Sequence, residues 1–503
     1  MTAAPTATST SATTTDRRGL ALALLAATQF VLILDAAIVN VALPSIGRDL
    51  RFAPDDLSWV ANAYILTFGG FLLLGGRVAD LAGRRRMFVV GLALFVAASM
   101  LGALAPSALW LIVARAMQGL GAALVSPAAL SLVMTLFDEG PERNRALGVF
   151  GAVAGSGAAA GSILGGLLTD WFGWQAVLYV NVPIGAVAIA LAPRLLPASR
   201  AAGPGRSFDL AGAVSVTAGL ALLVYALVDA NDTGWASAQT LTLGALALAL
   251  IAAFVVIEAR AAHPLVPPGI FRLRTLRGAN IVAVLLTMAM FPMFFFLTLY
   301  LQHVLGYGPI RAGLGQLPIA LTIAVMAGVT SRLVTRFGFK APLVAGLLVV
   351  GAGLAWFSQL SAPGGTYVAD ILGPSILSGV GGALVFISVT IAATTGARAH
   401  EAGLASGLIN TTQQVGGALG LALLVAVATA RTDAVLAAGG QSPAVALTEG
   451  FQAALLAGAG IAVVAALLAS VLVSSAGSRA HDAVGGGTEQ DETGRDEATA
   501  VAA

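Results

Sequence analysis

The chain is built from long apolar runs, each of the length that crosses a lipid bilayer. A spanning helix needs about 20 mainly apolar residues. Backbone polar groups in lipid must be paired within their own segment, so runs of this length predict helices. Fourteen of them lie between charged residues or Pro and Gly breaks, at 19–43, 58–79, 87–105, 109–136, 145–168, 174–192, 210–229, 239–257, 278–301, 312–335, 341–360, 368–393, 403–427 and 450–474.

The composition leads to the same class. Hydrophobic residues make up 58% of the 503 residues and charged residues only 10%, whereas soluble domains carry about 25% charged residues. This balance excludes an ordinary soluble protein, and it also excludes a disordered chain, which needs low hydrophobicity and high charge. The 60 glycines suit closely packed membrane helices. We therefore expect an all-α, multi-pass membrane protein with the lipid bilayer as its surroundings.

The basic residues set the orientation of the predicted spans. Most of the 26 Lys and Arg residues fall on the side of the N-terminus, whereas Arg48, Arg51, Arg311 and Arg431 fall on the opposite side and Arg115 lies within a span. Cytoplasmic loops are the ones enriched in Lys and Arg. We therefore expect both termini in the cytoplasm and the protein in the cytoplasmic (inner) cell membrane. Because the basic residues mark topology, no nucleic-acid partner is expected.

A faint internal duplication divides the chain. GRVADLAGRRR at 76–86 aligns with SRLVTRFGFKA at 331–341, and GLGAAL at 119–124 aligns with GVGGAL at 379–384. Repeats of this kind place a substrate cavity between two halves near the membrane midplane. The predicted parts are a cytoplasmic N-terminal tail at 1–18, a six-helix half at 19–192, a linker with two extra helices at 193–277, a second six-helix half at 278–474 and a disordered cytoplasmic tail at 475–503.

Sequence signatures of enzymes are missing. There is no GxxxxGK[ST] motif for ATP, no HExxH motif, no cluster among the 4 His, and no Cys. We therefore expect no enzymatic activity, no cofactor, no bound metal and no use of ATP as the energy source. A polytopic sensor would need a soluble effector domain, and the short tails offer none.

Asp35 and Arg115 are ionisable residues deep inside apolar runs. An ionised side chain there costs several kcal/mol unless it is paired or hydrated, so such residues are functional candidates by default. Desolvation also makes reversible protonation of a carboxylate feasible. At 1.5 Å per residue, Asp35 lies about 12 Å and Arg115 about 9 Å from the outer ends of their helices. This matched depth predicts a charge pair, and helix packing is the alternative role for each residue.

Several segments carry a family resemblance. LDAAIVNVALP at 34–44, GRVADLAGRRR at 76–86, RAMQGLGAALVSPA at 115–128, GSILGGLL at 161–168, WFGWQAVLYVNVPIG at 171–185 and GLASGLINTTQQVGGALG at 403–420 resemble motifs of the major facilitator superfamily. They look like its fourteen-helix drug:proton antiporter branch. Ser162 stands where this branch usually has Pro, and Gln175 where it usually has Arg. The resemblance implies two six-helix halves plus two inserted helices, and it assigns proton coupling to Asp35 with Arg115 as its switchable partner.

Two further groups of residues are candidates for the transport cycle. A conformational gate is expected at the loop after the second span and on the fifth span, where plain anchoring by arginines and plain glycine packing are the alternatives. Neutral polar and aromatic side chains are candidates for the substrate cavity, with lipid-facing or core positions as the alternative. The gate candidates are Gly76, Asp80, Gly83, Arg84, Gly157, Gly161, Gly165 and Gly166; the cavity candidates are Asn40, Trp59, Tyr64, Gln118, Phe291, Phe295, Asn410, Gln413 and Gln414.

Together these features predict a monomeric secondary antiporter that exports a drug or antibiotic in exchange for protons and so confers resistance. The substrate is expected to be a neutral or monocationic amphiphile, because no second deep carboxylate is evident. Proton-coupled transport of an endogenous metabolite, siderophore or lipid is the alternative.

Overall fold

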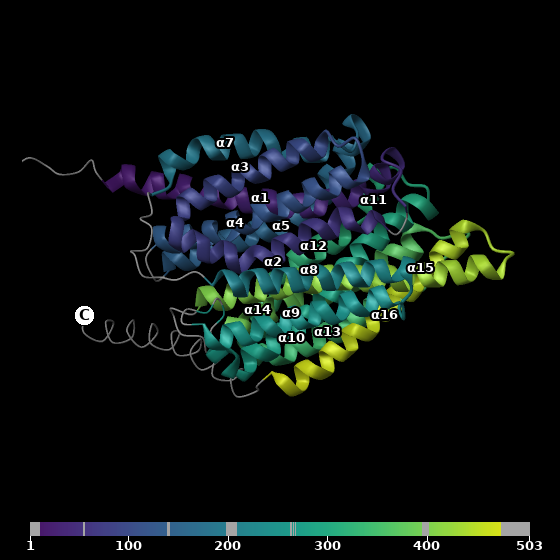
Figure 1. The fold of residues 1–503 in the computed structure, drawn as a ribbon. Coiled ribbons are helices and arrows are strands. Elements are labelled where there is room, and N and C mark those ends of the chain that lie inside the picture. The colour runs from purple at the N-terminus through teal and green to yellow at the C-terminus, as the bar shows by residue number, and fades with distance from the viewer. Residues whose placement is uncertain are drawn as a thin grey trace, which may run out of the picture. The chain divides into compact units, whose positions relative to one another are not determined.

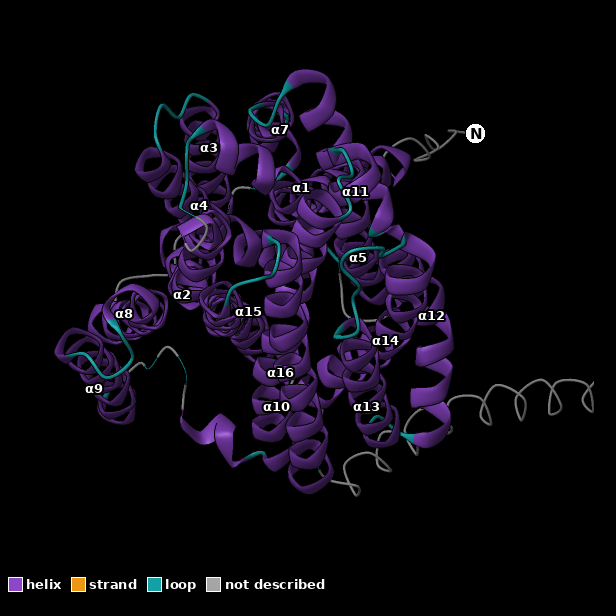
Figure 2. Cartoon of the chain, turned by 90° about the vertical axis from the view of Figure 1, so that its right-hand side faces the viewer, coloured by secondary structure: helices purple, strands orange, loops and turns teal. Residues whose placement is uncertain are grey.

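The computed structural model describes residues 11–53, 56–137, 141–197, 209–261, 264, 266, 268–394 and 402–473. Over these ranges the chain consists of helices and short connections without a β-strand (Figures 1 and 2). The predicted C-terminal tail and most of the predicted N-terminal tail lie outside the described residues. The chain divides into two units, residues 1–52 with 59–208 and residues 53–58 with 209–503.

The first unit contains the helices of the predicted N-terminal half. In chain order these are α1 (Ser11–Asp49), α2 (Trp59–Ala82), α3 (Arg84–Ala103), α4 (Ala108–Leu136), α5 (Pro141–Phe172), α6 (Ala176–Tyr179) and α7 (Asn181–Leu195). The chain turns sharply at two glycines, because Gly83 between α2 and α3 has a φ of 100° and Gly173 after α5 has a φ of 84°. Only glycine adopts such angles without strain.

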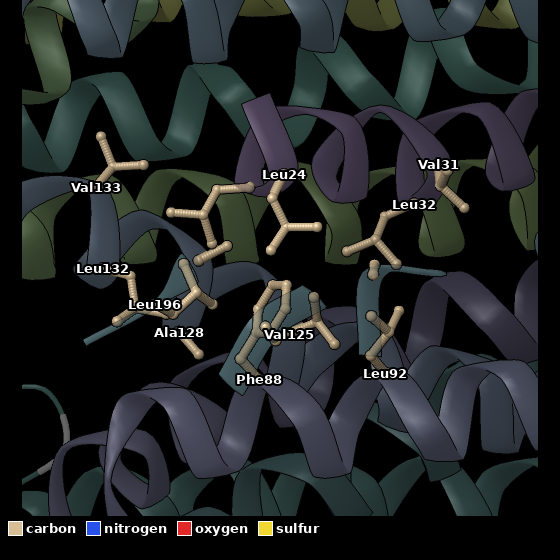
Figure 3. Packing of buried hydrophobic residues seen from close by; sticks show 14 of the residues in the cluster. Leu24, Val31, Leu32, Phe88, Leu92, Val125, Ala128, Leu132, Val133 and Leu196 are labelled. Carbon is tan, nitrogen blue, oxygen red and sulfur yellow. The ribbon is translucent and has the colours of Figure 1, made fainter. Parts of the chain in front are cut away.

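The core of the first unit lies where α1, α3 and α4 meet. Leu24 and Leu32 of α1 face Phe88 of α3 and Val125 of α4 (Figure 3). All four side chains are buried, so they form one continuous apolar contact. This packing places α1 beside α4, and both of these helices carry charged residues of the candidate site.

The second unit begins with a two-helix hairpin, α8 (Leu210–Thr233) and α9 (Ala238–Arg260), which pack on each other. The remaining helices are α10 (Arg274–Leu299), α11 (Pro309–Gly315), α12 (Leu317–Phe337), α13 (Lys340–Phe357), α14 (Gly373–Thr394), α15 (Ala402–Ala438) and α16 (Pro443–Leu472). Short 3₁₀ helices cover Asp56–Ser58 and Pro268–Arg272, and π-helical turns extend α10 at Tyr300–Val304 and precede α14 at Tyr367–Leu372.

Both units repeat one packing scheme internally. In the first unit α2 and α3 pack on α4, while α1 packs on α5; in the second unit α12 and α13 pack on α14, while α10 packs on α15. The turn between the paired helices also recurs, because Gly338 after α12 has a positive φ of 72°, as Gly83 does after α2. These two glycines occupy the same place in the aligned segments 76–86 and 331–341. The sequence duplication therefore corresponds to a repeated helix arrangement.

Eleven helical segments of the described chain are long and apolar enough to cross a membrane. Each of the fourteen predicted spans lies mainly on helix. Several helices exceed the bilayer, since α1 has 39 residues, a length of about 58 Å at 1.5 Å per residue against a hydrocarbon core of about 30 Å. The chain is thus a multi-pass, all-helical membrane protein.

Candidate functional site

The candidate site of the first unit centres on a buried ion pair between α1 and α4. Nη1 of Arg115 lies 2.6 Å from Oδ2 of Asp35. Asp35 is 0% exposed and Arg115 is 1% exposed. Breaking such a pair by removing one partner leaves an uncompensated buried charge, which costs about 3–5 kcal/mol. The structure thus brings together the two residues that the sequence placed at matched depths.

Arg115 is held by contacts beyond the carboxylate. Its Nε donates to the carbonyl oxygen of Val60 at 3.1 Å, and its Nη1 also donates to Oε1 of Gln118 at 3.0 Å. The guanidinium carbon lies 4.4 Å from the ring centroid of Tyr64, whose hydroxyl donates to the carbonyl of Leu32 at 3.1 Å. A guanidinium suits this site because it can donate in several directions and stack on an aromatic face at once.

The second carboxylate oxygen of Asp35 accepts two amide hydrogen bonds. Nδ2 of Asn181 lies 2.6 Å from Oδ1 of Asp35, and Nε2 of Gln118 lies 3.2 Å from the same oxygen. The hydroxyl oxygen of Ser99 accepts from Nε2 of Gln118 at 2.7 Å and from Nδ2 of Asn181 at 3.4 Å. Both carboxylate oxygens of Asp35 therefore accept hydrogen bonds from N–H donors.

The local sequence explains how four helices, α1, α3, α4 and α7, deliver these side chains. Arg115 and Gln118 are three residues apart on α4 and therefore share one face. Asn181 is the first residue of α7, directly after the α6 turn, and Pro183 follows in the first turn of α7, where a missing N–H is tolerated. We refer to Asp35, Ser99, Arg115, Gln118 and Asn181 as the carboxylate network.

Sequence reasoning missed two members of the carboxylate network. Ser99 lies in the apolar run of α3, and Asn181 lies within a segment that contributed only to the family resemblance. Both side chains are neutral, so placing them in an apolar helix costs less free energy than placing a charge there. They therefore stand out less in the sequence. The signal available in the sequence was that each is a polar residue in an apolar stretch. The structure buries both residues completely.

Glycines on α5 bring that helix against α1 next to the ion pair. A Cβ on Gly161 would lie 2.7 Å from the Cβ of Ala37 and 2.9 Å from the carbonyl oxygen of Leu34. Gly157 and Gly165 face α1 in the same way, and Gly166 is buried. The small-residue face predicted on the fifth span therefore forms a close contact with the helix that carries Asp35. The side chain of Ser162 lies outside the described residues.

The repeated packing scheme lets the network be compared with the second unit. When the 260-position offset between the aligned segments 119–124 and 379–384 is continued to the residues just before them, Arg115 matches Ser375 and Gln118 matches Ser378. Both serines are 0% exposed. Small hydroxyl side chains thus occupy the positions where the first unit has its guanidinium and amide, and the buried ion pair belongs to the first unit.

The predicted cavity residues of the first unit separate into two kinds. Gln118 and Tyr64 are 0% exposed and belong to the surroundings of the ion pair, so they do not line an open cavity in this structure. Asn40 and Trp59 are half-buried. The sequence could not separate these cases, because all four residues interrupt apolar helices in a similar way.

The predicted cavity residues of the second unit lie on α10 and α15. Phe295 is buried in the core, where its ring packs edge-on against Phe296 with centroids 5.5 Å apart, so it does not line a cavity in this structure. Phe291 is half-buried beside α15. Asn410 is exposed, and Gln413 and Gln414 are half-buried.

The other four predicted gate residues, Gly76, Asp80, Gly83 and Arg84, lie at the α2–α3 turn or on the end of α2 before it. Gly83 makes the turn with its positive φ, and Nη1 of Arg84 donates to Oγ1 of Thr135 on α4 at 2.7 Å. At Gly76 on α2 a Cβ would lie 3.5 Å from the Cβ of Pro127 on α4, which is an ordinary van der Waals distance. The side chain of Asp80 lies outside the described residues.

Comparisons with known proteins agree with this architecture. Residues 25–421 match the Major Facilitator Superfamily. The chain is 42% identical to the puromycin resistance protein of Streptomyces alboniger, over 91% of this chain and 92% of that protein. It is 44% identical to the cephamycin export protein of Amycolatopsis lactamdurans, over 83% of this chain and 86% of that protein.

A solved structure shares the fold at low sequence identity. The POT family transporter PepTSo superposes with a TM-score of 0.64 at 17% identity, covering 92% of this chain and 98% of that chain. This likeness shows the helix arrangement alone, whereas the family match over most of the chain defines the class, a membrane transporter. This chain belongs to the Major Facilitator Superfamily, and its relatives include antibiotic resistance and export proteins.

Proposed function

We propose that this protein is a proton-coupled antiporter that exports an antibiotic or related amphiphilic drug across the cytoplasmic membrane by alternating access. The observation that carries the proposal is the buried Asp35–Arg115 pair, with 2.6 Å between Nη1 and Oδ2. The substrate class is supported by relatives named for puromycin and cephamycin, two chemically different antibiotics. The proposed topology has fourteen spans with both termini in the cytoplasm, and the protein acts as a monomer.

The pair can couple protons to conformation through its charge balance. When Asp35 is ionised, its charge compensates that of Arg115. Protonation of Asp35 leaves a buried guanidinium without its counter-charge, which costs several kcal/mol in this arrangement. A conformation that hydrates or re-pairs Arg115 then becomes favoured, because a ligand shifts an equilibrium by its differential affinity for the two states.

Burial supplies the second requirement of coupling. Asp35 is 0% exposed, so it exchanges protons with water only when the contacts between α1, α4 and α7 open. A carboxylate that is closed off in one conformation and accessible in another is the element that alternating access needs. The gate residues at the α2–α3 turn and the α1–α5 glycine contact are the proposed sites of this rearrangement.

The test is drug-induced proton movement in proteoliposomes that hold the purified full-length protein. Adding puromycin or a cephamycin outside vesicles with a trapped pH indicator should release protons from the lumen through inside-out oriented protein, and a protonophore should abolish drug accumulation. A panel of other antibiotics covers substrates outside these two classes. Drug transport that is insensitive to collapse of the proton gradient would overturn the mechanism, and no transport of any antibiotic would favour the metabolite alternative.

A further inference from the structure

The carboxylate network contains one amide that is bonded at only one of its two polar atoms. Nδ2 of Asn181 donates to Oδ1 of Asp35 at 2.6 Å. Oδ1 of Asn181 is buried and has no hydrogen-bond partner within the part of the chain that the structure describes. Buried polar atoms are normally hydrogen-bonded, so an orphaned acceptor beside a titratable group calls for an explanation.

The other amide of the network is held at both ends. Oε1 of Gln118 accepts from Arg115, and Nε2 of Gln118 donates to Ser99 and to Asp35. Turning the Gln118 amide would place its oxygen against the carboxylate and its N–H group against the guanidinium. Asn181 has no such restraint on Oδ1, so its amide is the one that can turn.

The ionised and protonated forms of Asp35 need opposite partners. The described neighbours of the carboxylate oxygens, on Arg115, Gln118 and Asn181, all present N–H donors, which suit only the ionised form. A protonated carboxyl group has an O–H that requires an acceptor. Oδ2 faces the guanidinium of Arg115, which keeps its protons, so the proton is received on Oδ1.

We propose that Asn181 is a positioning residue that follows the protonation state of Asp35 by turning its side-chain amide. This inference rests on the proposed function. With Asp35 ionised, Nδ2 donates to Oδ1 of Asp35, as in this structure. A proton from water then forms an O–H bond on Oδ1, and half a turn of the amide brings the orphaned oxygen of Asn181 into place to accept that hydrogen. Nothing else is transferred in this step.

The turn preserves the hydrogen bonds of the amide. In this structure the amide donates to Asp35 and, at 3.4 Å, to the hydroxyl of Ser99. After the turn its oxygen accepts from the carboxyl O–H of Asp35 and from the Ser99 hydroxyl, which can donate as well as accept. Either orientation leaves one amide atom unpaired, so the two orientations differ mainly in which form of Asp35 they stabilise. Among the described residues, the charged and titratable neighbours of the carboxyl group are Arg115 on α4 and Tyr64 on α2.

Infrared difference spectroscopy of the reconstituted full-length protein between low and high pH tests the turn directly. The carboxyl C=O band of Asp35 is identified by its loss in Asp35→Asn. In Asn181→Leu, we expect this band to move to higher frequency, because the O–H has lost its acceptor, and we expect one amide C=O change to disappear. Asn280→Leu is the matched control, because Asn280 is a buried asparagine on α10 of the second unit, bonded to Leu276 and Thr412. It should leave the Asp35 band unchanged.

Transport kinetics supply the second readout. Asn181→Leu should lower the maximal rate of proton-driven efflux by about tenfold or more, with the KM for drug within about threefold of the wild-type value. Asn181→Asp keeps the shape and places two carboxyl groups in contact, where they share a proton. Its half-maximal transport should therefore move to higher pH by about one unit or more. If Asn181→Leu does not insert into the membrane, the pH profile of Asn181→Asp still tests the role of Asn181.

The outcomes separate the two proposals. Proton-driven efflux that survives in Asp35→Asn overturns the proposed function. Efflux that is lost in Asp35→Asn while both Asn181 variants keep the wild-type band position, rate and pH profile overturns only the role of Asn181. A uniform loss of protein in both Asn181 variants, with unchanged spectra in the protein that remains, also assigns Asn181 to folding alone and overturns the inference.

Discussion

Asp35 and Arg115 are 80 positions apart in the chain, and their side chains meet at 2.6 Å with almost no exposed surface. In a low-dielectric interior, an ion pair compensates its desolvation penalty only when both charges are present and fully hydrogen-bonded. The carboxylate network meets this condition, since both oxygens of Asp35 accept N–H donors. Each described hydrogen-bond contact of the carboxyl group therefore suits an ionised carboxylate.

Asp35→Asn should abolish proton-driven efflux and leave membrane insertion intact. The amide keeps the size of the side chain, but it cannot take up and release a proton. Asp49→Asn is the matched control, because Asp49 is an exposed residue at the end of α1 that accepts from Nε1 of Trp174 at 2.7 Å. Drug uptake into inverted vesicles with an imposed pH gradient measures the efflux activity of both variants. Undiminished proton-driven transport by Asp35→Asn would contradict the assignment of proton coupling to Asp35.

Arg115→Lys should reduce proton-driven efflux at least about tenfold, although it preserves the charge. A single ammonium cannot reproduce the separate bonds to Asp35, Gln118 and the Val60 carbonyl or the stacking on Tyr64. Initial rates of drug uptake into inverted vesicles, normalised to protein amount, measure the effect. A lysine variant with wild-type rates would show that only the positive charge matters.

The stability of the ion pair can be separated from its function by a double substitution. Arg115→Met leaves the Asp35 carboxylate buried without its partner and should destabilise the protein by about 3–5 kcal/mol. Adding Asp35→Leu removes the second charge and should recover most of that loss, since apolar replacements of buried pairs are often neutral or better. Thermal unfolding of the purified protein in detergent measures the recovery. Efflux should stay absent in the double variant, and equal instability of the single and double variants would contradict the expected energetics.

Gly161→Ala should destabilise the first unit by about 1–3 kcal/mol, because the new methyl group would overpack the α1–α5 contact. Its Cβ would come within 2.7 Å of the Cβ of Ala37. Gly328→Ala on α12 is the control, since a Cβ there meets nothing within 4 Å. Replacing a glycine in a helix interior gains up to about 1 kcal/mol, so the two variants should shift the unfolding temperature in opposite directions. Equal shifts would mean that α5 can move away from α1 without cost.

Gly83→Ala should slow transport and destabilise the α2–α3 turn, whereas Gly76→Ala should have a smaller effect. Gly83 has a φ of 100°, and a side chain held at such an angle costs about 1–3 kcal/mol. A Cβ on Gly76 would make an ordinary 3.5 Å contact with Pro127. Efflux rates and unfolding temperatures of the two variants, measured side by side, test the difference. A larger effect at Gly76 would show that helix approach, not the turn, limits the gate.

The sequence by itself determined the helices, the class of protein and the two membrane charges. Apolar runs of about 20 residues must form helices in lipid, and a charge inside such a run stands out wherever the helix lies. Gly83 and Gly338 also align in the sequence, because each makes a turn with a positive φ that favours glycine. These are local properties, so they survive without knowledge of the packing.

Only the tertiary structure decided which neutral side chains join the charges. Asn181 reaches Asp35 across 146 positions, and Ser99 reaches Gln118 from a different helix. Gln118 and Tyr64, which the sequence suggested for the cavity, surround the ion pair instead. A neutral polar residue in an apolar helix has no preferred partner in its own segment. Its partner is set by the rotation and spacing of the packed helices, and here the packing leaves one oxygen of Asn181 unpaired beside the carboxylate.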